Sequence, residues 1–464
     1  FLLSVIKKMD KKKIIELKKK FEDLLSKEPN NKDALFSLAA LHYNLGNSSL
    51  RKKKIDIAIK HYLQSIKVDK KFVPSYFNLG NAYKEKEDLE KAIKYFKTAV
   101  DIDPNNIPAK INLGVANSAI GNSKDCIKHF MDLLTQNNYK SSLNKIMESD
   151  IRYSLGIELL REGRYEEGLQ NYEHRLQASD YSLDLNQYKN KPSNLNEIKN
   201  KKVLVVAEQG IGDVFQFIRY LKLLEKYASE IYFQCSKKLF RVLKCIRSIK
   251  KFYDLDEKIK DYDFCIPLLS LPLLFNSNLK TIPNFSSYIC PEEKLVNTWN
   301  NKLKKKEGYK VGLFWKGNTE STGSKKRAIN LKDLETLLEL KKINFISLQK
   351  GEGHEEIKKT KFSKYMIDND KIIDTGKDAF VDTAAIIKNL DLVISIDTGM
   401  VQLCGAIGTK IWMLSPKVPN WPWTNYGTTT PWYSSLKIFR QEKVNDWEKP
   451  IKNLKNKLSE ILQQ

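Results

Sequence analysis

Cysteine is scarce in this sequence, and the cysteines that it has are scattered. Only six occur among 464 residues, and no two of them form a CxxC pair. This spacing argues against a zinc site and against a disulfide framework. Histidine is also scarce, and four of the five histidines lie in predicted helices without metal-ligand spacing to one another: His42, His61, His129 and His174. We therefore expect a reduced protein with no metal site.

Long apolar runs are absent as well. No stretch of about 20 apolar residues occurs, so we expect no transmembrane segment. The opening residues 1–6 are too short for the core of a signal peptide. The chain does not begin with methionine; either Met9 is the natural start or the sequence is a fragment. These features favour a cytoplasmic protein, either free or held peripherally at the inner membrane surface.

The net charge of +24 is high, yet dense basic blocks interleaved with aromatic residues are missing. Lysines are instead spread along the whole chain among asparagines and isoleucines. A basic chain can bind nucleic acid, a membrane surface or anionic substrates. Because no basic patch is concentrated, nucleic acid is the weakest of these alternatives, and we expect no nucleic-acid partner.

The first part of the chain contains an internal repeat with a period of about 34 residues. One copy matches the tetratricopeptide pattern position by position, at Tyr76, Leu79, Gly80, Tyr83, Ala92, Phe96, Ala99 and Pro104. Weaker copies surround it. In this pattern, small residues let two antiparallel helices approach, and large residues fill the space between neighbouring pairs. We predict a helical solenoid over 1–178, with a helix over 14–25 capping it. Such repeats bind protein partners in a groove.

A strand, a glycine turn and a helix follow one another in 202–224. Residues 202–207 are valine-rich and of strand length, a polar turn with two glycines follows, and apolar residues then recur at helical spacing. Such a unit directs backbone N–H groups at the carboxyl end of the strand, which favours an anion there. An ordinary tight turn is the alternative, because two glycines are less than a dinucleotide fingerprint. Asp213 adds a carboxylate at the mouth of the crevice.

Strands and helices continue to alternate through two predicted domains, 201–305 and 306–464, which a polar linker over 179–200 joins to the repeats. In the first domain we predict strands at 202–207, 230–235 and 262–267, with a helix at 238–246. Asp261 and Asp263 have the spacing of some metal-dependent sugar-nucleotide sites, but a polar approach to a buried strand is the favoured interpretation.

In the second domain we predict strands at 310–315, 343–348, 392–396 and 410–414, and helices at 331–340, 380–387, 401–407 and 446–462. A polar loop is expected at 317–326, and Asn330 can cap the helix that follows. A second glycine turn, Asp397-Thr398-Gly399-Met400, ends one strand and begins a helix. Ligands of open α/β sheets bind outside the carboxyl ends of the strands, so two such domains predict a cleft. Lys316 and Arg327 could neutralise phosphate there, or could simply be solvated surface charges.

Taken in order, these segments resemble glycosyltransferase family 9, the ADP-heptose:lipopolysaccharide heptosyltransferases, joined to bacterial tetratricopeptide repeats. The segments that carry the resemblance are AEQGIGDVFQFIRYLKLL, FCIPLLSLP, VGLFWKGN, KRAINLKDLETLL, ISLQKG, DLVISIDTGMVQLCGAIG and WPW…PWY…IFRQ. The resemblance implies a GT-B fold, in which two Rossmann-like domains enclose the active site. Residues 201–305 would bind the acceptor, and 306–464 would bind the donor.

The resemblance also implies site residues. The donor is a nucleotide-activated sugar, used without a metal or other cofactor and with inversion at the anomeric carbon. The general base falls on Asp213, and the acceptor-side turn on Gln209, Gly210 and Gly212. The groups toward the donor and its phosphates fall on Lys316, Arg327, Gln349, Asp397, Thr398, Gly399, Met400 and Gln402. Family members carry a histidine soon after the second turn, whereas Gln402 can form hydrogen bonds but cannot titrate. Many relatives also have a small residue at the position of Lys316.

We therefore expect an inverting glycosyltransferase that transfers a sugar to a glycan, lipid-linked or protein acceptor, with repeats that bind the acceptor or a partner protein. A protein O-glycosyltransferase is one alternative, since such enzymes also join these repeats to a GT-B core. A catalytically inactive repeat scaffold that retains the transferase fold is the other, and Gln402 favours it.

Overall fold

The computed structural model describes residues 11–463, apart from 136–143, 182, 185–186, 189, 304–307, 319–325 and 369. The opening residues 1–6, Met9, parts of the predicted linker and most of the predicted loop at 317–326 lie outside the described residues. The chain divides into two compact units, Phe1–Leu155 and Gly156–Gln464.

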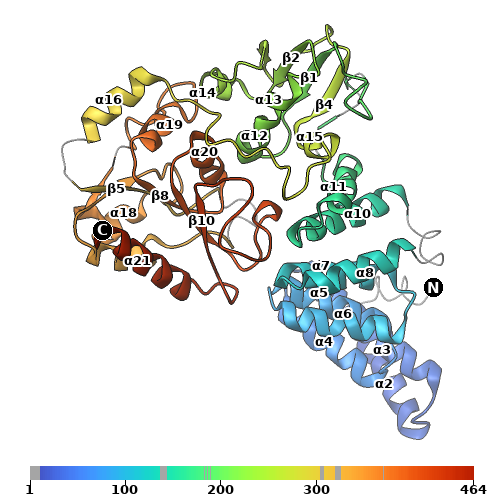
Figure 1. Cartoon of the computed structure of the whole chain (residues 1–464). Helices are drawn as coiled ribbons and strands as arrows, with labels where there is room; N and C mark the ends of the chain where they lie inside the picture. Colours follow the sequence, from blue (N-terminus) through green and yellow to red (C-terminus); the bar gives the residue numbers. More distant parts are fainter. Residues whose placement is uncertain are drawn as a thin grey trace. The chain divides into compact units, whose positions relative to one another are not determined.

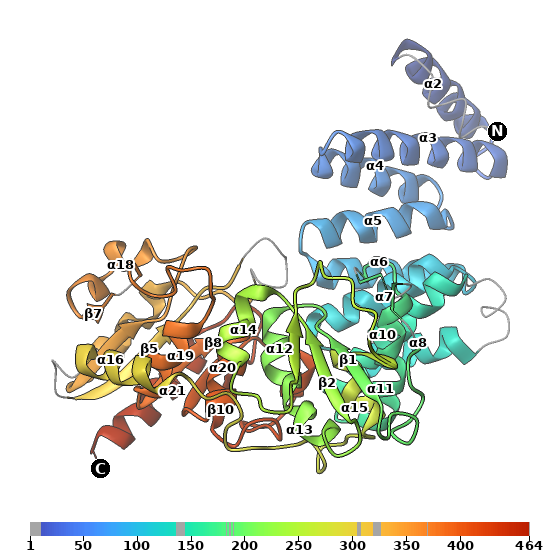
Figure 2. The same cartoon turned by 90° about the horizontal axis from the view of Figure 1, so that it is seen from above.

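The first unit is a stack of antiparallel helices (Figures 1 and 2). Its helices are α2 (Lys11–Lys27), α3 (Lys32–Arg51), α4 (Ile55–Val68), α5 (Val73–Glu85), α6 (Leu89–Ile102), α7 (Ile107–Ile120), α8 (Ser123–Thr135) and the first part of α10 (Lys145–Arg161). A methyl group added to Gly80 would come within 2.6 Å of the Phe96 ring, and Gly114 faces Phe130 in the same way. The predicted pairing of small with large residues is confirmed.

The second unit contains two parallel sheets. The four-stranded sheet has the order β3-β2-β1-β4, with β1 (Lys202–Val206), β2 (Glu230–Gln234), β3 (Lys251–Tyr253) and β4 (Phe264–Pro267). The six-stranded sheet has the order β10-β9-β8-β5-β6-β7, with β5 (Tyr309–Phe314), β6 (Ile343–Ser347), β7 (Met366–Ile367), β8 (Leu392–Ile396), β9 (Ile411–Ser415) and β10 (Leu436–Arg440). Each predicted strand is present, and the fold class is confirmed: a tetratricopeptide solenoid followed by two Rossmann-like sheets.

Helices connect and cover these strands. The α-helices are α11 (Tyr165–Tyr172), α12 (Ile211–Phe217), α13 (Leu221–Leu224), α14 (Phe240–Leu243), α15 (Leu271–Leu274), α16 (Glu293–Leu303), α18 (Glu356–Lys359), α19 (Val381–Lys388), α20 (Gly399–Ile407) and α21 (Glu448–Gln463). Short 3-10 helices occur at η1 (Glu173–Gln177), η3 (Ile218–Tyr220), η4 (Lys237–Leu239), η5 (Leu268–Ser270), η6 (Leu331–Glu339), η7 (Lys361–Lys364) and η8 (Trp421–Trp423). One hydrophobic core packs α21 and η6 on the six-stranded sheet through Leu454, Leu458, Leu331 and Leu334.

Two local predictions need correction. The segment after Asn330 is a 3-10 helix, and the Asn330 side chain makes no capping hydrogen bond. Glu356 takes that place, because its Oε2 accepts a hydrogen bond of 2.8 Å from the Leu331 N–H. The helix predicted at 238–246 ends at Leu243, and its first turn is 3-10.

Candidate active site

The two glycine turns of the second unit lie against each other. Gly212 is in the first turn of α12, and Gly399 begins α20 in the other sheet domain. A methyl group built on Gly212 would come within 3.0 Å of the Gly399 Cα atom. Any side chain at 212 would therefore push the two helices apart. Glycine at this position allows the carboxyl ends of β1 and β8 to open into one shared cleft.

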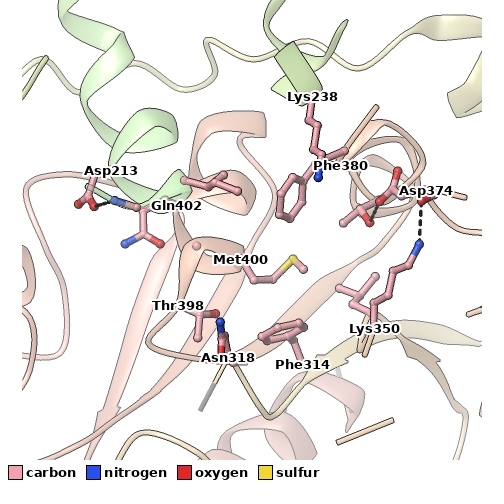
Figure 3. Close-up of a pocket in the computed structure, with 18 of the residues that line it drawn as sticks. Asp213, Lys238, Phe314, Asn318, Lys350, Asp374, Phe380, Thr398, Met400 and Gln402 are labelled. Atoms are coloured by element: carbon pink, nitrogen blue, oxygen red, sulfur yellow. Dashed lines mark hydrogen bonds between the residues drawn. The ribbon is translucent and has the colours of Figure 1, made fainter. Parts of the chain in front are cut away.

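This cleft has a volume of about 840 Å³ and is lined by residues of both sheet domains. The domain of the four-stranded sheet contributes Gly210, Ile211, Gly212, Asp213 and Lys238. The domain of the six-stranded sheet contributes Arg327, Lys350, Thr398, Gly399, Met400 and Gln402 among others (Figure 3). Most of the site residues predicted from the sequence thus line one cavity, large enough for a drug-sized ligand.

Asp213 lies on the wall of the cleft and is partly buried. Its Oδ2 accepts a hydrogen bond of 3.0 Å from the Gly210 N–H, which fixes the carboxylate at the start of α12. Burial raises the pKa of Asp213 to about 6; the Gly210 hydrogen bond opposes this shift, and the nearby Glu208 and Asp397 carboxylates add to it. A carboxylate with such a pKa is ionised at neutral pH yet basic enough to take a proton in a reaction.

Behind this turn, Glu208 anchors the four-stranded sheet domain through a buried network that the sequence did not reveal. Its carboxylate accepts hydrogen bonds from Arg175 Nη2 at 2.6 Å and Arg175 Nε at 3.1 Å. The Tyr181 hydroxyl and the Leu269 N–H donate to the same carboxylate at 2.9 and 3.0 Å. Burial opposes the charge of Arg175, but Glu208 and Glu173 outweigh it and raise the pKa of Arg175. The turn is therefore held by a segment that lies before the predicted linker.

The second glycine turn presents the start of α20 to the cleft. Thr398 is the extended residue before the helix, and its side chain makes no capping hydrogen bond. The first N–H groups of any α-helix have no partner inside the helix and favour negative charge. Met400, in the first turn of α20, and Gln402, about one turn after Gly399, also line the cleft. Gln402 is only 7% exposed, and among the described residues its Oε1 has no hydrogen-bond partner.

Four predicted site residues do not line the cleft. The Lys316 Nζ lies 3.1 Å from Glu356 Oε1. Gln349 accepts hydrogen bonds from the N–H groups of Trp315 and Lys316, and its Nε2 donates to two carbonyl oxygens. The hydrogen-bonding groups of these two side chains are therefore turned inward, toward the six-stranded sheet domain. Their roles in donor binding remain predictions.

Asp397 and Gln209 are also turned away from the cleft. Asp397 is fully buried, where its Oδ1 accepts a hydrogen bond of 2.7 Å from Trp423 Nε1. Asn420 donates two further hydrogen bonds to the same carboxylate, at 3.2 and 3.3 Å. Gln209 has a positive φ of 58° and its side chain faces the Tyr172 hydroxyl. Each of these two side chains therefore supports the backbone of its turn on the side that faces away from the cleft.

Several lining residues were missed in the sequence. Lys350 lies three residues after the end of β6, so the rule on strand ends could have found it; its Nζ donates to the carbonyl oxygens of Ile373 and Asp374. Lys238 reaches the cleft from the four-stranded sheet domain (Figure 3). Phe380 has a φ of 63°, a costly backbone conformation for a bulky residue, and packs edge-to-face on Phe215 at 5.3 Å. No sequence signal marks Phe380.

The described residues contain neither a metal-binding cluster nor a membrane-spanning helix. Within that part of the chain, no group of three or more His, Cys, Asp or Glu side chains could hold a metal ion. None of the described helices is long and apolar enough to cross a membrane.

Comparisons with known proteins cover both units. The family model for the tetratricopeptide repeat matches residues 39–72 and 73–106. Protein FlbA of Caulobacter vibrioides is 26% identical over 323 residues, which are 62% of this chain and 52% of that protein. The chain therefore spans about half the length of this curated relative.

Two solved transferase structures are similar to this chain. The glycosyl transferase family 9 structure from Veillonella parvula has a TM-score of 0.40 and 12% identity, covering 53% of this chain and 87% of that chain. The E. coli ADP-heptose lps heptosyltransferase II structure has a TM-score of 0.40 and 11% identity, covering 57% and 99%. By its family matches and its own structure, the chain joins tetratricopeptide repeats, at residues 39–106, to an α/β unit with the two-sheet architecture that its sequence predicted.

Proposed function

We propose that the second unit is an inverting glycosyltransferase, which transfers a sugar from a nucleotide-activated donor to a hydroxyl group of a glycan, lipid-linked or protein acceptor. The observation that carries the proposal is the position of Asp213. A partly buried carboxylate with a pKa of about 6 lines the same cleft as the N-terminus of α20. The ordered motifs that resemble glycosyltransferase family 9 support the same reaction.

In this reaction, the acceptor oxygen forms a bond to the anomeric carbon of the sugar. The bond between that carbon and the diphosphate oxygen breaks, and its electron pair leaves with the nucleoside diphosphate. Asp213 takes the proton of the acceptor hydroxyl as the new bond forms. The free N–H groups at the start of α20 and the lining Arg327 stabilise the negative charge of the departing diphosphate.

The test is the Asp213→Asn variant, which keeps the shape of the side chain but removes the base. Purified protein is incubated with labelled nucleotide sugars and the lipid and protein fractions of a bacterial lysate. We expect transfer to fall by about 100- to 10,000-fold, while nucleotide binding is kept. Asp261→Asn is the matched control, because Asp261 is an exposed aspartate whose side chain pairs with Lys202.

Transfer by Asp213→Asn at near the wild-type rate, in a folded protein, would contradict the assignment of the base. The labelled product identifies the acceptor class. Label in the protein fraction would favour a protein O-glycosyltransferase, and label in the lipid fraction a glycolipid-directed enzyme. In either case we propose that the tetratricopeptide repeats bind the acceptor or a partner protein.

An inactive scaffold is the second candidate, and Gln402 in place of the expected histidine favours it. The two candidates differ in ligand binding, because a retained but inactive fold need not bind a donor. Nucleotide sugars that bind the native state should raise the melting temperature. A panel of nucleoside diphosphates and nucleotide sugars without any such effect would favour the scaffold.

A further inference from the structure

The side-chain amide of Gln402 is buried, and its oxygen accepts no hydrogen bond from the described residues. Its side chain is 7% exposed, and its Oε1 has no hydrogen-bond partner among the described residues. Gln349, a buried glutamine of the same domain, is different: it accepts two hydrogen bonds and donates two. Buried polar groups in folded proteins are nearly always paired, so an unpaired one needs an explanation.

The position of Gln402 points to a ligand as that explanation. The residue lies on α20, one helical turn after Gly399, and lines the cleft. A methyl group built on Gly212, in the opposite domain, would come within 3.4 Å of Gln402 Oε1. In the view of Figure 3, the amide lies between the side chains of Asp213 and Thr398. The unpaired oxygen is buried against Gly212, where the two glycine turns meet beside the cleft.

The chemistry of the amide selects the group that it can bind. Its oxygen only accepts hydrogen bonds, and the oxygens of an ionised diphosphate carry no hydrogen to donate. A diphosphate beside Gln402 would leave Oε1 buried and unpaired, at a cost of about 1–3 kcal/mol. A hydroxyl group can donate to the oxygen and also accept from the amide nitrogen. Turning the amide over exchanges its two ends but leaves one acceptor and one donor to be satisfied.

We propose that Gln402 binds a hydroxyl group of the sugar being transferred and so helps to select that sugar. This inference rests on the proposed function. The N–H groups at the start of α20 bind the diphosphate, and Gln402, one turn along the same helix, binds the sugar that is attached to it. Gln402 is thus a specificity residue, and the uncharged amide makes this contact independent of pH.

The experiment compares each diphosphate with its own sugar nucleotide. Isothermal titration of the full chain with ADP, GDP, UDP, ADP-glucose, GDP-mannose and UDP-glucose selects the base that binds. The dissociation constants of the selected pair are then measured for Gln402→Leu and for Gln402→Met, a closer match in shape. Gln441→Leu is the matched control, because Gln441 is another buried glutamine with one unpaired amide atom and does not line the cleft.

We expect both Gln402 variants to bind the sugar nucleotide about 10- to 100-fold more weakly, since a buried hydrogen bond is lost. Binding of the diphosphate should change by less than about twofold, and Gln441→Leu should change neither constant by more than that. Equal losses for the diphosphate and the sugar nucleotide would overturn the inference, as would no loss for either. A wild-type chain that binds none of the six probes would overturn the proposed function together with the inference.

Discussion

Each of the two glycine turns of the α/β unit joins a strand to a helix, but the two turns place their aspartate side chains differently. In the first turn, Asp213 follows the glycines and its carboxylate lines the cleft. In the second, Asp397 precedes the glycine and its carboxylate is fully buried against Trp423 and Asn420. The first turn also has an acid before its glycines, Glu208, which is buried against Arg175. In both turns the acid before the glycine is therefore buried and hydrogen-bonded, whereas Asp213, which follows the glycines, lines the cleft.

The largest effect that separates the two acids should come from Asp397→Ala. This change leaves the buried Trp423 indole N–H without its acceptor, and it removes the acceptor of the Asn420 N–H groups as well. We expect a loss of about 3 kcal/mol in the free energy of unfolding. Urea titration measures it, with Asp391→Ala, at the start of β8, as the control. A loss below about 1 kcal/mol would show that Asp397 does not hold its turn.

A smaller effect of opposite sign should come from Asp213→Asn. The folded state raises the pKa of Asp213 from 3.8 to about 6, so folding favours the protonated form. The wild type therefore loses stability as the pH rises from about 4 through 6, whereas the asparagine variant does not. At pH 7.5 the variant should be more stable by about 1–2 kcal/mol, after allowance for solvent screening. Calorimetry at pH 4 and 7.5 would contradict this if the gain were independent of pH.

The same shift predicts how the transfer rate depends on pH. The base must be ionised, so the rate should rise about tenfold for each pH unit below 6 and level off above it. A rate profile between pH 4.5 and 8 measures this. A transfer rate that does not change across pH 6, in a protein that stays folded, would show that Asp213 is not the base.

Gly212→Ala tests whether the contact between the turns matters. The added methyl group would lie 3.0 Å from the Gly399 Cα atom, a backbone atom that cannot rotate away. We expect a loss of about 1 kcal/mol in stability, together with weaker transfer. Gly376→Ala is the control, because a methyl group there meets no atom within 4 Å. Equal effects at both glycines would argue against a specific contact.

The smallest effect should come from Lys316→Met. This lysine pairs with Glu356, and its side chain is 22% exposed. Breaking such a pair should cost less than about 1 kcal/mol, and nucleotide affinity should change by less than about threefold. Titration of the variant with the same nucleotides measures this. A larger loss of nucleotide affinity would support the prediction that Lys316 binds the phosphate groups.

Some features of the fold could be read from the sequence because they depend on local patterns. Buried strands such as β8 appear as continuous apolar runs, and the rule on strand ends brings Asp213 and Thr398 to one cleft. The strands that were missed are short or alternate with charge: β3 has three residues, and β10 includes Lys437 and Arg440.

The site was less predictable because side-chain direction depends on distant partners. Lys316 follows a strand that ends near the cleft. Its ammonium group, however, pairs with Glu356, at the start of α18, and is therefore directed away from the cleft. Arg175 and Glu208 are 33 positions apart and belong to segments of different type, so no motif links them. Phe380 lines the cleft through a backbone conformation that a phenylalanine rarely adopts.

The hydrogen bonds between Arg175 and Glu208, behind the first glycine turn, also limit where the chain can be shortened. A chain that begins after the predicted solenoid, at residue 179, would lack Arg175 and leave the Glu208 carboxylate buried without its cation. It would also lack Tyr165, whose hydroxyl accepts a hydrogen bond of 3.1 Å from the Trp432 indole. The helical segment over 156–178 therefore belongs structurally to the second unit, which begins at Gly156. A shortened chain needs to keep the residues from Gly156 onward.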